Sequence, residues 1–65
     1  MITLGSVMDQ NGELSDFLEV VVDYGICSPK DSVENAIEKM KKDSRLKKYG
    51  GTLARTIDRL ENYAY

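Results

Sequence analysis

The chain has 65 residues, a formal net charge of −2, one cysteine and no histidine. At this length we expect one small domain over residues 1–65 with a marginal core, because such a chain buries only about 60% of its unfolded surface. The lone Cys27 excludes an internal disulfide, and the commonest metal ligand is missing. We therefore expect no metal and no cofactor, and stability that comes from packed helices or from association.

Nothing in the sequence predicts insertion into a membrane or export. The N-terminus lacks the basic start and following apolar run of a signal peptide. No apolar run approaches the roughly 20 residues that a membrane-spanning helix needs. A single cysteine is typical of a reducing compartment, so the sequence predicts a cytoplasmic protein.

The first 12 residues allow two interpretations. Ile2 and Leu4 could lie on a short strand that turns at Asn11-Gly12, a dipeptide typical of two-residue hairpins. Leu4 and Val7 instead have the spacing of one helix face. The conformation of this segment stays open, with a turn expected at its end.

The stretch 13–24 contains three consecutive valines, which favour a strand. On a helix, however, its apolar side chains fill one broad arc and its acids fill the opposite side, with Val20 alone among the acids. Gly25 follows where helices often end in the left-handed conformation, and Ile26 can pack back against the helix. We predict a helix over 13–24. Its apolar arc consists of Leu14, Phe17, Leu18, Val21, Val22 and Tyr24.

The second predicted helix runs from Pro29 to Asp43. Ser28 can cap it, and Pro29 suits the first helical position, where no backbone N–H is needed. Asp31 comes three residues after Ser28, so the two approximate a capping box. The apolar face of this helix consists of Val33, Ala36, Ile37 and Met40.

Residues 44–51 are predicted to form a connector with room for one short helical turn. Leu46 would fall off the apolar face of the preceding helix, and the double glycine at the end is a firm break. A third helix is predicted over 52–63, with Thr52 as its cap. Its apolar stripe consists of Leu53, Ile57, Leu60 and Ala64, and Arg55, Arg59 and Asn62 point away from it.

These elements predict an all-α fold, a small bundle of three helices near 13–24, 29–43 and 52–63. The minor alternative is an α+β fold with a short N-terminal hairpin. The expected core consists of Phe17, Leu18, Val21, Val33, Ile37, Met40, Leu53, Ile57 and Leu60.

The residues needed for common catalytic sites are absent from the sequence. Without histidine, neither a Ser-His nor a Cys-His nucleophile pair can form. Cys27, just before a predicted helix N-terminus, could have a lowered pKa, although a small linker residue is the plainer interpretation. The run 49–52 lacks the spacing of a phosphate-binding loop. We therefore expect a protein that is not an enzyme.

Charge is divided along the chain. Residues 1–28 contain five acids and no lysine or arginine, whereas residues 39–59 contain eight basic residues and two acids. Both could be solvated faces. The sharper interpretation is that the acidic side of the first helix imitates nucleic-acid phosphates and docks into a basic groove of a protein partner. The residues expected to bind this partner are Asp16, Glu19, Val20 and Asp23.

The alternative is a small DNA- or RNA-binding protein, since phosphate neutralisation needs grouped lysine and arginine. The run Thr-Leu-Ala-Arg-Thr-Ile-Asp-Arg-Leu-Glu (52–61) resembles the recognition helix of MarR-type winged-helix repressors. That resemblance implies that Thr52, Arg55 and Arg59 approach DNA. It covers ten of 65 residues, and the family's function is not carried over. The candidate nucleic-acid-binding residues are Lys41, Lys42, Arg45, Lys47, Lys48, Thr52, Arg55 and Arg59.

The preferred hypothesis is a small non-enzymatic regulator or inhibitor that binds another macromolecule. Proteins of this size without catalytic groups are common in phages and mobile elements, where they modulate host machinery. We expect its target to be a host protein that handles nucleic acid. A third interpretation is a subunit whose surfaces serve only its own homo-oligomer.

Overall fold

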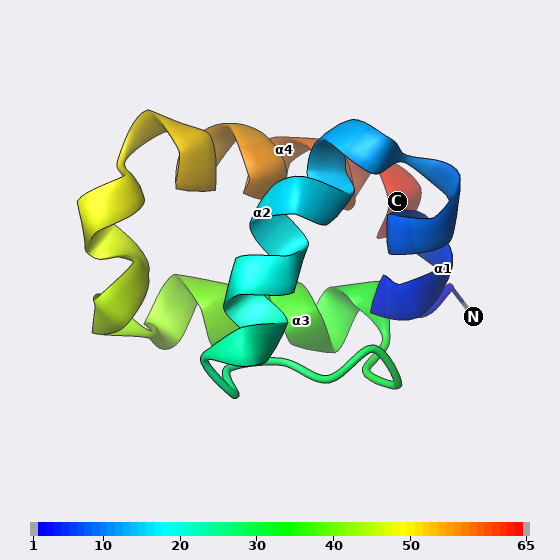
Figure 1. The fold of residues 1–65 in the computed structure, drawn as a ribbon, viewed down its shortest axis with the longest axis horizontal. Helices are drawn as coiled ribbons and strands as arrows, with labels where there is room; N and C mark the ends of the chain where they lie inside the picture. The colour runs from blue at the N-terminus through cyan, green and yellow to red at the C-terminus, as the bar shows by residue number, and fades with distance from the viewer. Residues whose placement is uncertain (1, 65) are drawn as a thin grey trace.

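The all-α prediction is confirmed by a computed structural model of the protein, which describes residues 2–64. Its elements are α1 (Leu4–Gln10), α2 (Gly12–Asp23), α3 (Val33–Lys42), the 3-10 helix η1 (Ser44–Tyr49) and α4 (Gly51–Ala64). In Figure 1, α3 and α4 run along opposite long edges and α2 lies across them. η1 joins α3 to α4 at one end, and α1 lies at the other.

α1 is the first addition to the three predicted helices. Thr3 caps it, and its hydroxyl accepts a hydrogen bond from the Ser6 backbone N–H at 3.2 Å. The side chains of Leu4 and Val7 are fully buried, as their helical spacing requires. A strand over the same residues would place positions of opposite parity on opposite faces, so it could not bury this pair together.

Asn11 joins α1 to α2. Its backbone N–H donates to the Val7 carbonyl at 2.8 Å, which closes the end of α1. Its side-chain oxygen accepts from the backbone N–H groups of Glu13 and Leu14 at 3.1 and 3.2 Å, which caps α2. The predicted turn is therefore a junction of two helices. The hairpin alternative is wrong, since the structure has no strand within residues 2–64.

α2 confirms the predicted helix, with each end displaced by one residue. Gly25 has a φ of 77°, and its N–H donates to the Val22 carbonyl at 2.9 Å. The Ile26 N–H donates to the Val21 carbonyl at 3.2 Å, which completes a Schellman motif. Ile26 packs into the core behind this cap. One buried face and two caps therefore outweigh the strand propensity of the valines.

The predicted start of the second helix at Pro29 is wrong, because α3 begins at Val33. Ser32, not Ser28, caps it and accepts from the Asn35 backbone N–H at 3.2 Å. Ser28 instead opens a turn. Its carbonyl accepts from the Asp31 N–H at 2.9 Å, and its own N–H donates to the Asp31 carboxylate at 2.9 Å.

Contact with α1 explains why the helix starts late. The first backbone N–H groups of a helix lack partners within it, and here Leu4 and Gly5 donate theirs to the carbonyls of Asp31 and Pro29 at 2.8 and 3.0 Å. The approach is close, because a Cβ on Gly5 would lie 3.1 Å from the Pro29 carbonyl oxygen. Hydrogen bonds between α1 and the segment 29–31 thus take the place of the first helical turn that the local sequence favours.

η1 is more than the connector that the sequence predicts. The Asp43 carboxylate accepts from the Arg45 backbone N–H at 2.9 Å and begins this helix. The tighter turn of a 3-10 helix changes the direction in which successive side chains point. As a result Leu46, expected to lie off the apolar face, is fully buried.

The prediction for α4 is partly wrong. Thr52 is not its cap but lies exposed within the first turn. Leu60 is fully buried as expected, whereas Leu53 and Ile57 are only partly buried and pack at the edge of the core. Thr56, which lies outside the predicted stripe, is buried.

Within residues 2–64, the core draws on every helix and on the loop after α2. Besides Leu60, it contains the predicted Phe17, Leu18, Val21, Val33, Ile37 and Met40. The buried apolar residues outside the predicted core are Leu4, Val7, Leu14, Ile26, Cys27, Ala36 and Leu46.

Candidate functional site

The acidic face of α2 consists of Asp16, Glu19, Val20 and Asp23, the residues that the sequence assigns to a protein partner. The three acids are exposed and Val20 is half-buried. The structure thus brings the four residues together on the side of α2 away from the core. None of the three acids takes part in an ion pair within residues 2–64.

Many of the basic residues, by contrast, already have partners within the chain. Among the predicted nucleic-acid-binding residues, Lys42, Lys47, Lys48 and Arg55 form no ion pair in the described part of the chain. The basic stretch 39–59 therefore offers less free charge than its composition suggests. Its ion pairs are Lys39 with Asp31 at 2.9 Å, Lys41 with Glu61 at 3.5 Å, Arg45 with Asp43 at 2.7 Å and Arg59 with Glu13 at 2.8 Å.

The three residues of the MarR-type resemblance line one hollow. Thr52, Arg55 and Arg59 lie along α4, and α2 closes the other side of a space of about 170 Å³. Glu13 of α2 also lines this space and holds Arg59. A phosphate at Arg59 would have to displace that carboxylate, so the hollow is a poor place for a DNA backbone.

The structure also forms a cluster that the sequence analysis does not predict, the tyrosine cluster of Tyr24, Arg45, Lys48 and Tyr49. The two tyrosine hydroxyls lie 3.2 Å apart. The Lys48 ammonium lies 5.5 Å from the centroid of the Tyr24 ring and 5.4 Å from that of Tyr49, within the range of cation–π attraction. The Tyr49 ring packs edge-on against Phe17, with centroids 5.2 Å apart, which fixes one side of the cluster.

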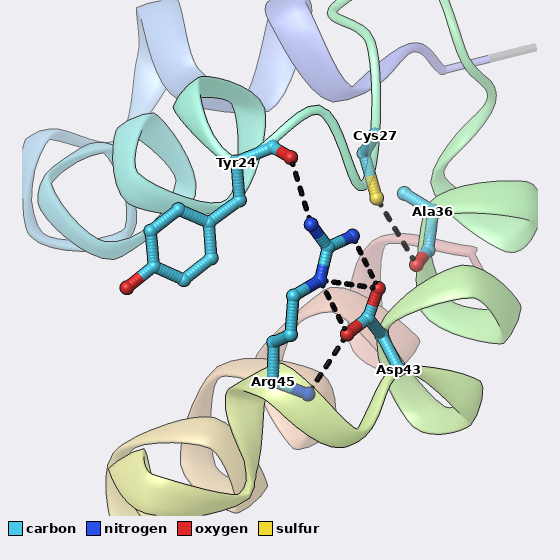
Figure 2. A network of polar contacts seen from close by, with 5 residues as sticks. All are labelled: Tyr24, Cys27, Ala36, Asp43 and Arg45. Carbon is cyan, nitrogen blue, oxygen red and sulfur yellow. Dashed lines mark hydrogen bonds and ion pairs between the residues drawn. The ribbon is translucent and has the colours of Figure 1, made fainter.

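Arg45 ties η1 to the end of α2 beside the Tyr24 ring (Figure 2). Its Nε and Nη2 donate to the Asp43 carboxylate at 3.0 and 2.7 Å, and its Nη1 donates to the Tyr24 carbonyl at 3.3 Å. That carbonyl lies at the C-terminus of α2, where acceptors lack helical partners and a positive charge is favourable. The contact therefore joins two segments of opposite charge.

The hydrogen bonds within the tyrosine cluster shift its ionisation. Lys48, followed by Tyr49, lowers the pKa of Tyr24. The Tyr24 hydroxyl in turn raises the pKa of Tyr49 and that of Lys48. Lys48 is thus held in its charged form, and Tyr24 is the tyrosine of the pair that deprotonates first.

Tyr24 is the residue of the tyrosine cluster whose place in the fold differs most from what its sequence spacing predicts. Helical periodicity places it at the edge of the apolar arc, yet it is 36% exposed. It is the C-cap of α2, next to the left-handed Gly25, and its ring lies beside η1 instead of entering the core. Its position directly before the helix-ending Gly25 is a sequence signal that the side chain can point away from the core. The contact with η1 could not be predicted from neighbouring residues, because η1 lies about 20 residues further along the chain.

Cys27 does not have the lowered pKa that was the alternative interpretation of its position. It is 5% exposed, and its thiol donates to the Ala36 carbonyl at 3.6 Å (Figure 2). Burial, followed by the negative charge of Asp31, raises the pKa of the thiol to about 11. The plainer interpretation, a small buried linker residue, therefore holds, and the alternative fails because α3 begins at Val33, so no helix N-terminus lies directly after the cysteine.

The described residues offer neither a cluster of metal-ligand side chains nor a membrane-spanning helix on which to base a function. Residues 2–64 contain no group of three histidine, cysteine or acidic side chains that could hold a metal ion. No helix in this part of the chain combines the length and apolar character needed to cross a membrane. Comparison of the chain with protein-family models, with curated proteins and with solved structures gave no match.

Proposed function

We propose that the protein is a small non-enzymatic binding protein that regulates or inhibits another macromolecule, and that the acidic face docks a basic surface of a protein partner. The supporting observation is that Asp16, Glu19 and Asp23 are exposed and form no ion pair within the described residues. Such charge steers an oppositely charged partner and selects against acidic ones. Val20 supplies an apolar contact between the acids.

The spacing of the acids supports a partner that handles nucleic acid. Asp16 and Asp23 lie seven residues apart, which corresponds to about 10 Å along a helix. With Glu19 between them, neighbouring charges of the acidic face lie about 4.5 and 6 Å apart along the helix axis. One strand of duplex DNA carries one charge per roughly 3.4 Å of helix axis. A groove that accepts a phosphate strand would therefore meet a row of negative charge on α2, at about two thirds of the charge density of a DNA strand.

The test is capture of host proteins on the immobilised chain, with mass spectrometry, in the presence and absence of nuclease. The test variant combines Glu19→Lys, Val20→Asp and Asp23→Lys. A control variant, Glu34→Lys with Glu38→Lys, reverses two exposed acids of α3 instead. We expect the test variant to lose a nuclease-resistant partner that the control retains, and duplex DNA to displace that partner from the parent. Equal capture by both variants would mean that the acidic face is only a solvated surface.

A second candidate function is nucleic-acid binding through the basic region, and the observation that favours it is the tyrosine cluster. An aromatic ring beside lysine and arginine is a common feature of nucleic-acid-binding surfaces. The affinity for DNA or RNA should then fall steeply with salt, because neutralised phosphates release counterions. The measurement is a titration of labelled oligonucleotides at increasing salt. Absence of binding at low salt would eliminate this function.

A further inference from the structure

We infer that the tyrosine cluster is a binding site for single-stranded nucleic acid, in which an unpaired base stacks on Tyr24 and the adjoining phosphates lie on lysines of η1 and α3. This inference rests on the second candidate function and deepens it. It moves the centre of binding from Arg55 and Arg59 on α4 to the junction of α2 and η1.

The aromatic half of the site is an exposed ring beside an open hollow. Tyr24, Arg45 and Lys48 line a space of about 470 Å³ at the surface. The Tyr24 hydroxyl bonds to Tyr49, and the Tyr24 carbonyl to Arg45, so the ring is held between two fixed points. Every nucleobase has a π face, so such a ring binds bases with little regard to sequence.

The charged half of the site continues from this hollow into a second one. Arg45 also lines a space of about 370 Å³ together with Lys39 and Lys42 of α3. Lys42 forms no ion pair in the described part of the chain, and the charge of Lys48 lies against the tyrosine rings without a carboxylate partner there. A strand that follows both hollows would pass an aromatic ring first and then a row of cations.

The acids near the site are few and mostly engaged. Asp43 lines the second hollow, but its carboxylate is held by the Arg45 guanidinium. Asp31 is paired with Lys39 in the same way. Asp23 precedes Tyr24 in sequence but lies on the acidic face, roughly 100° around the helix. Repulsion from these acids should lower the affinity for a nucleic-acid strand but should not prevent binding.

The ring selects a single strand over a duplex. Base faces within a duplex are covered by neighbouring base pairs, and only an unpaired base can be laid on an aromatic side chain. The hollow at Tyr24 is lined by three residues and is open, so it does not resemble the enclosed pocket that a free nucleotide needs. An oligonucleotide, which spans several weak contacts, fits this surface better than a mononucleotide.

The test is fluorescence anisotropy of a labelled oligothymidylate titrated with the full chain at low salt. Tyr24→Ala should weaken binding roughly tenfold, whereas Tyr24→Phe, which keeps the ring and loses only the hydroxyl bond to Tyr49, should retain most of the affinity. Lys48→Ala should weaken binding and make the slope of the salt dependence shallower by about 0.7, the contribution of one phosphate contact to a single strand. Lys30→Ala, an exposed lysine in the turn before α3, is the matched control and should leave the affinity unchanged. Circular dichroism should show the same helix content in every variant.

Three results would overturn the inference. Parental affinity in Tyr24→Ala would show that the strand binds elsewhere, while the second candidate function stands. Equal affinity for the duplex of the same sequence, or for thymidine monophosphate, would show that a stacked single strand is not the occupant. Absence of binding to any nucleic acid would remove the second candidate function together with the inference.

Discussion

The acidic face of α2 and the basic stretch 39–59 differ in how the chain uses their charge. Within the described residues, four cations of the basic stretch form ion pairs, and one of them, Arg45, also donates to the carbonyl at the end of α2. The acids of α2 at positions 16, 19 and 23 form no such contact within the described residues. A count of charges therefore overstates the free positive surface. The negative charge at these three positions is not offset in this way.

The two regions also differ in how they are attached to the core. η1 is anchored by the fully buried Leu46, and Arg45 adds a polar link beside it. The three acids of the acidic face are exposed, and the buried side chains of α2 lie on the opposite side of the helix. Changes at the anchors of η1, Leu46 and Arg45, should therefore alter stability, whereas changes of the three acids should leave stability nearly unchanged.

The largest effect should follow removal of the η1 anchor. Leu46→Ala leaves a cavity under a fully buried side chain and should lower the free energy of unfolding by about 2–5 kcal/mol. Ile37→Ala, in the middle of the buried face of α3, should have a similar cost. Small domains have little more stability than this, so both variants should be largely unfolded by circular dichroism. A urea curve equal to that of the parent would show that the replaced side chain does not support the core.

The next effect should separate two arginines of the basic stretch. Arg45→Ala removes the bonds to Asp43 and to the Tyr24 carbonyl, and should lower the melting temperature measurably. Arg55→Ala removes an exposed side chain that forms no ion pair in the described part of the chain, and should leave the melting temperature unchanged. Equal effects would mean that the bonds of Arg45 contribute nothing specific.

A smaller effect should appear at acid pH. The Lys39 ammonium, with help from the Ser28 backbone N–H, lowers the pKa of Asp31 below its ordinary value of 3.8. A carboxyl group whose pKa is lowered in the folded state stabilises the protein at pH values above its ordinary pKa. This stabilisation is lost as the pH falls through the lowered pKa. Asp31→Asn should therefore cost stability at pH 7 and little near pH 2. Asp16→Asn, at an acid without an ion pair, should cost little at either pH, as urea titrations can establish.

Local signals predict the parts of the fold that depend on one segment. The position of Asp16 opposite the core follows from helical periodicity alone, and so does the acidic face. The Schellman cap follows from the glycine at position 25. The start of α3 could not be predicted in this way, because Pro29 and Asp31 bond to residues of α1 far away in sequence. The tyrosine cluster has the same origin, since Tyr24 and Tyr49 are separated by 25 residues.

The smallest effect should come from the acidic face itself. Glu19→Lys with Asp23→Lys should change the free energy of unfolding by less than about 0.5 kcal/mol, because exposed positions without packing contacts rarely matter more. The Asp23→Lys substitution should itself be slightly stabilising, because it places a positive charge at the C-terminus of α2, where the negative charge of Asp23 opposes the helix dipole. Glu13→Lys is the comparison, because it breaks the ion pair with Arg59 and places two positive charges together. Urea unfolding should rank the Glu13 variant clearly below the double variant. The reverse order would show that Glu19 and Asp23 make stabilising contacts within the chain. The acidic face would then contribute to folding, as the paired residues of the basic stretch do, and its charge would not be explained by a partner.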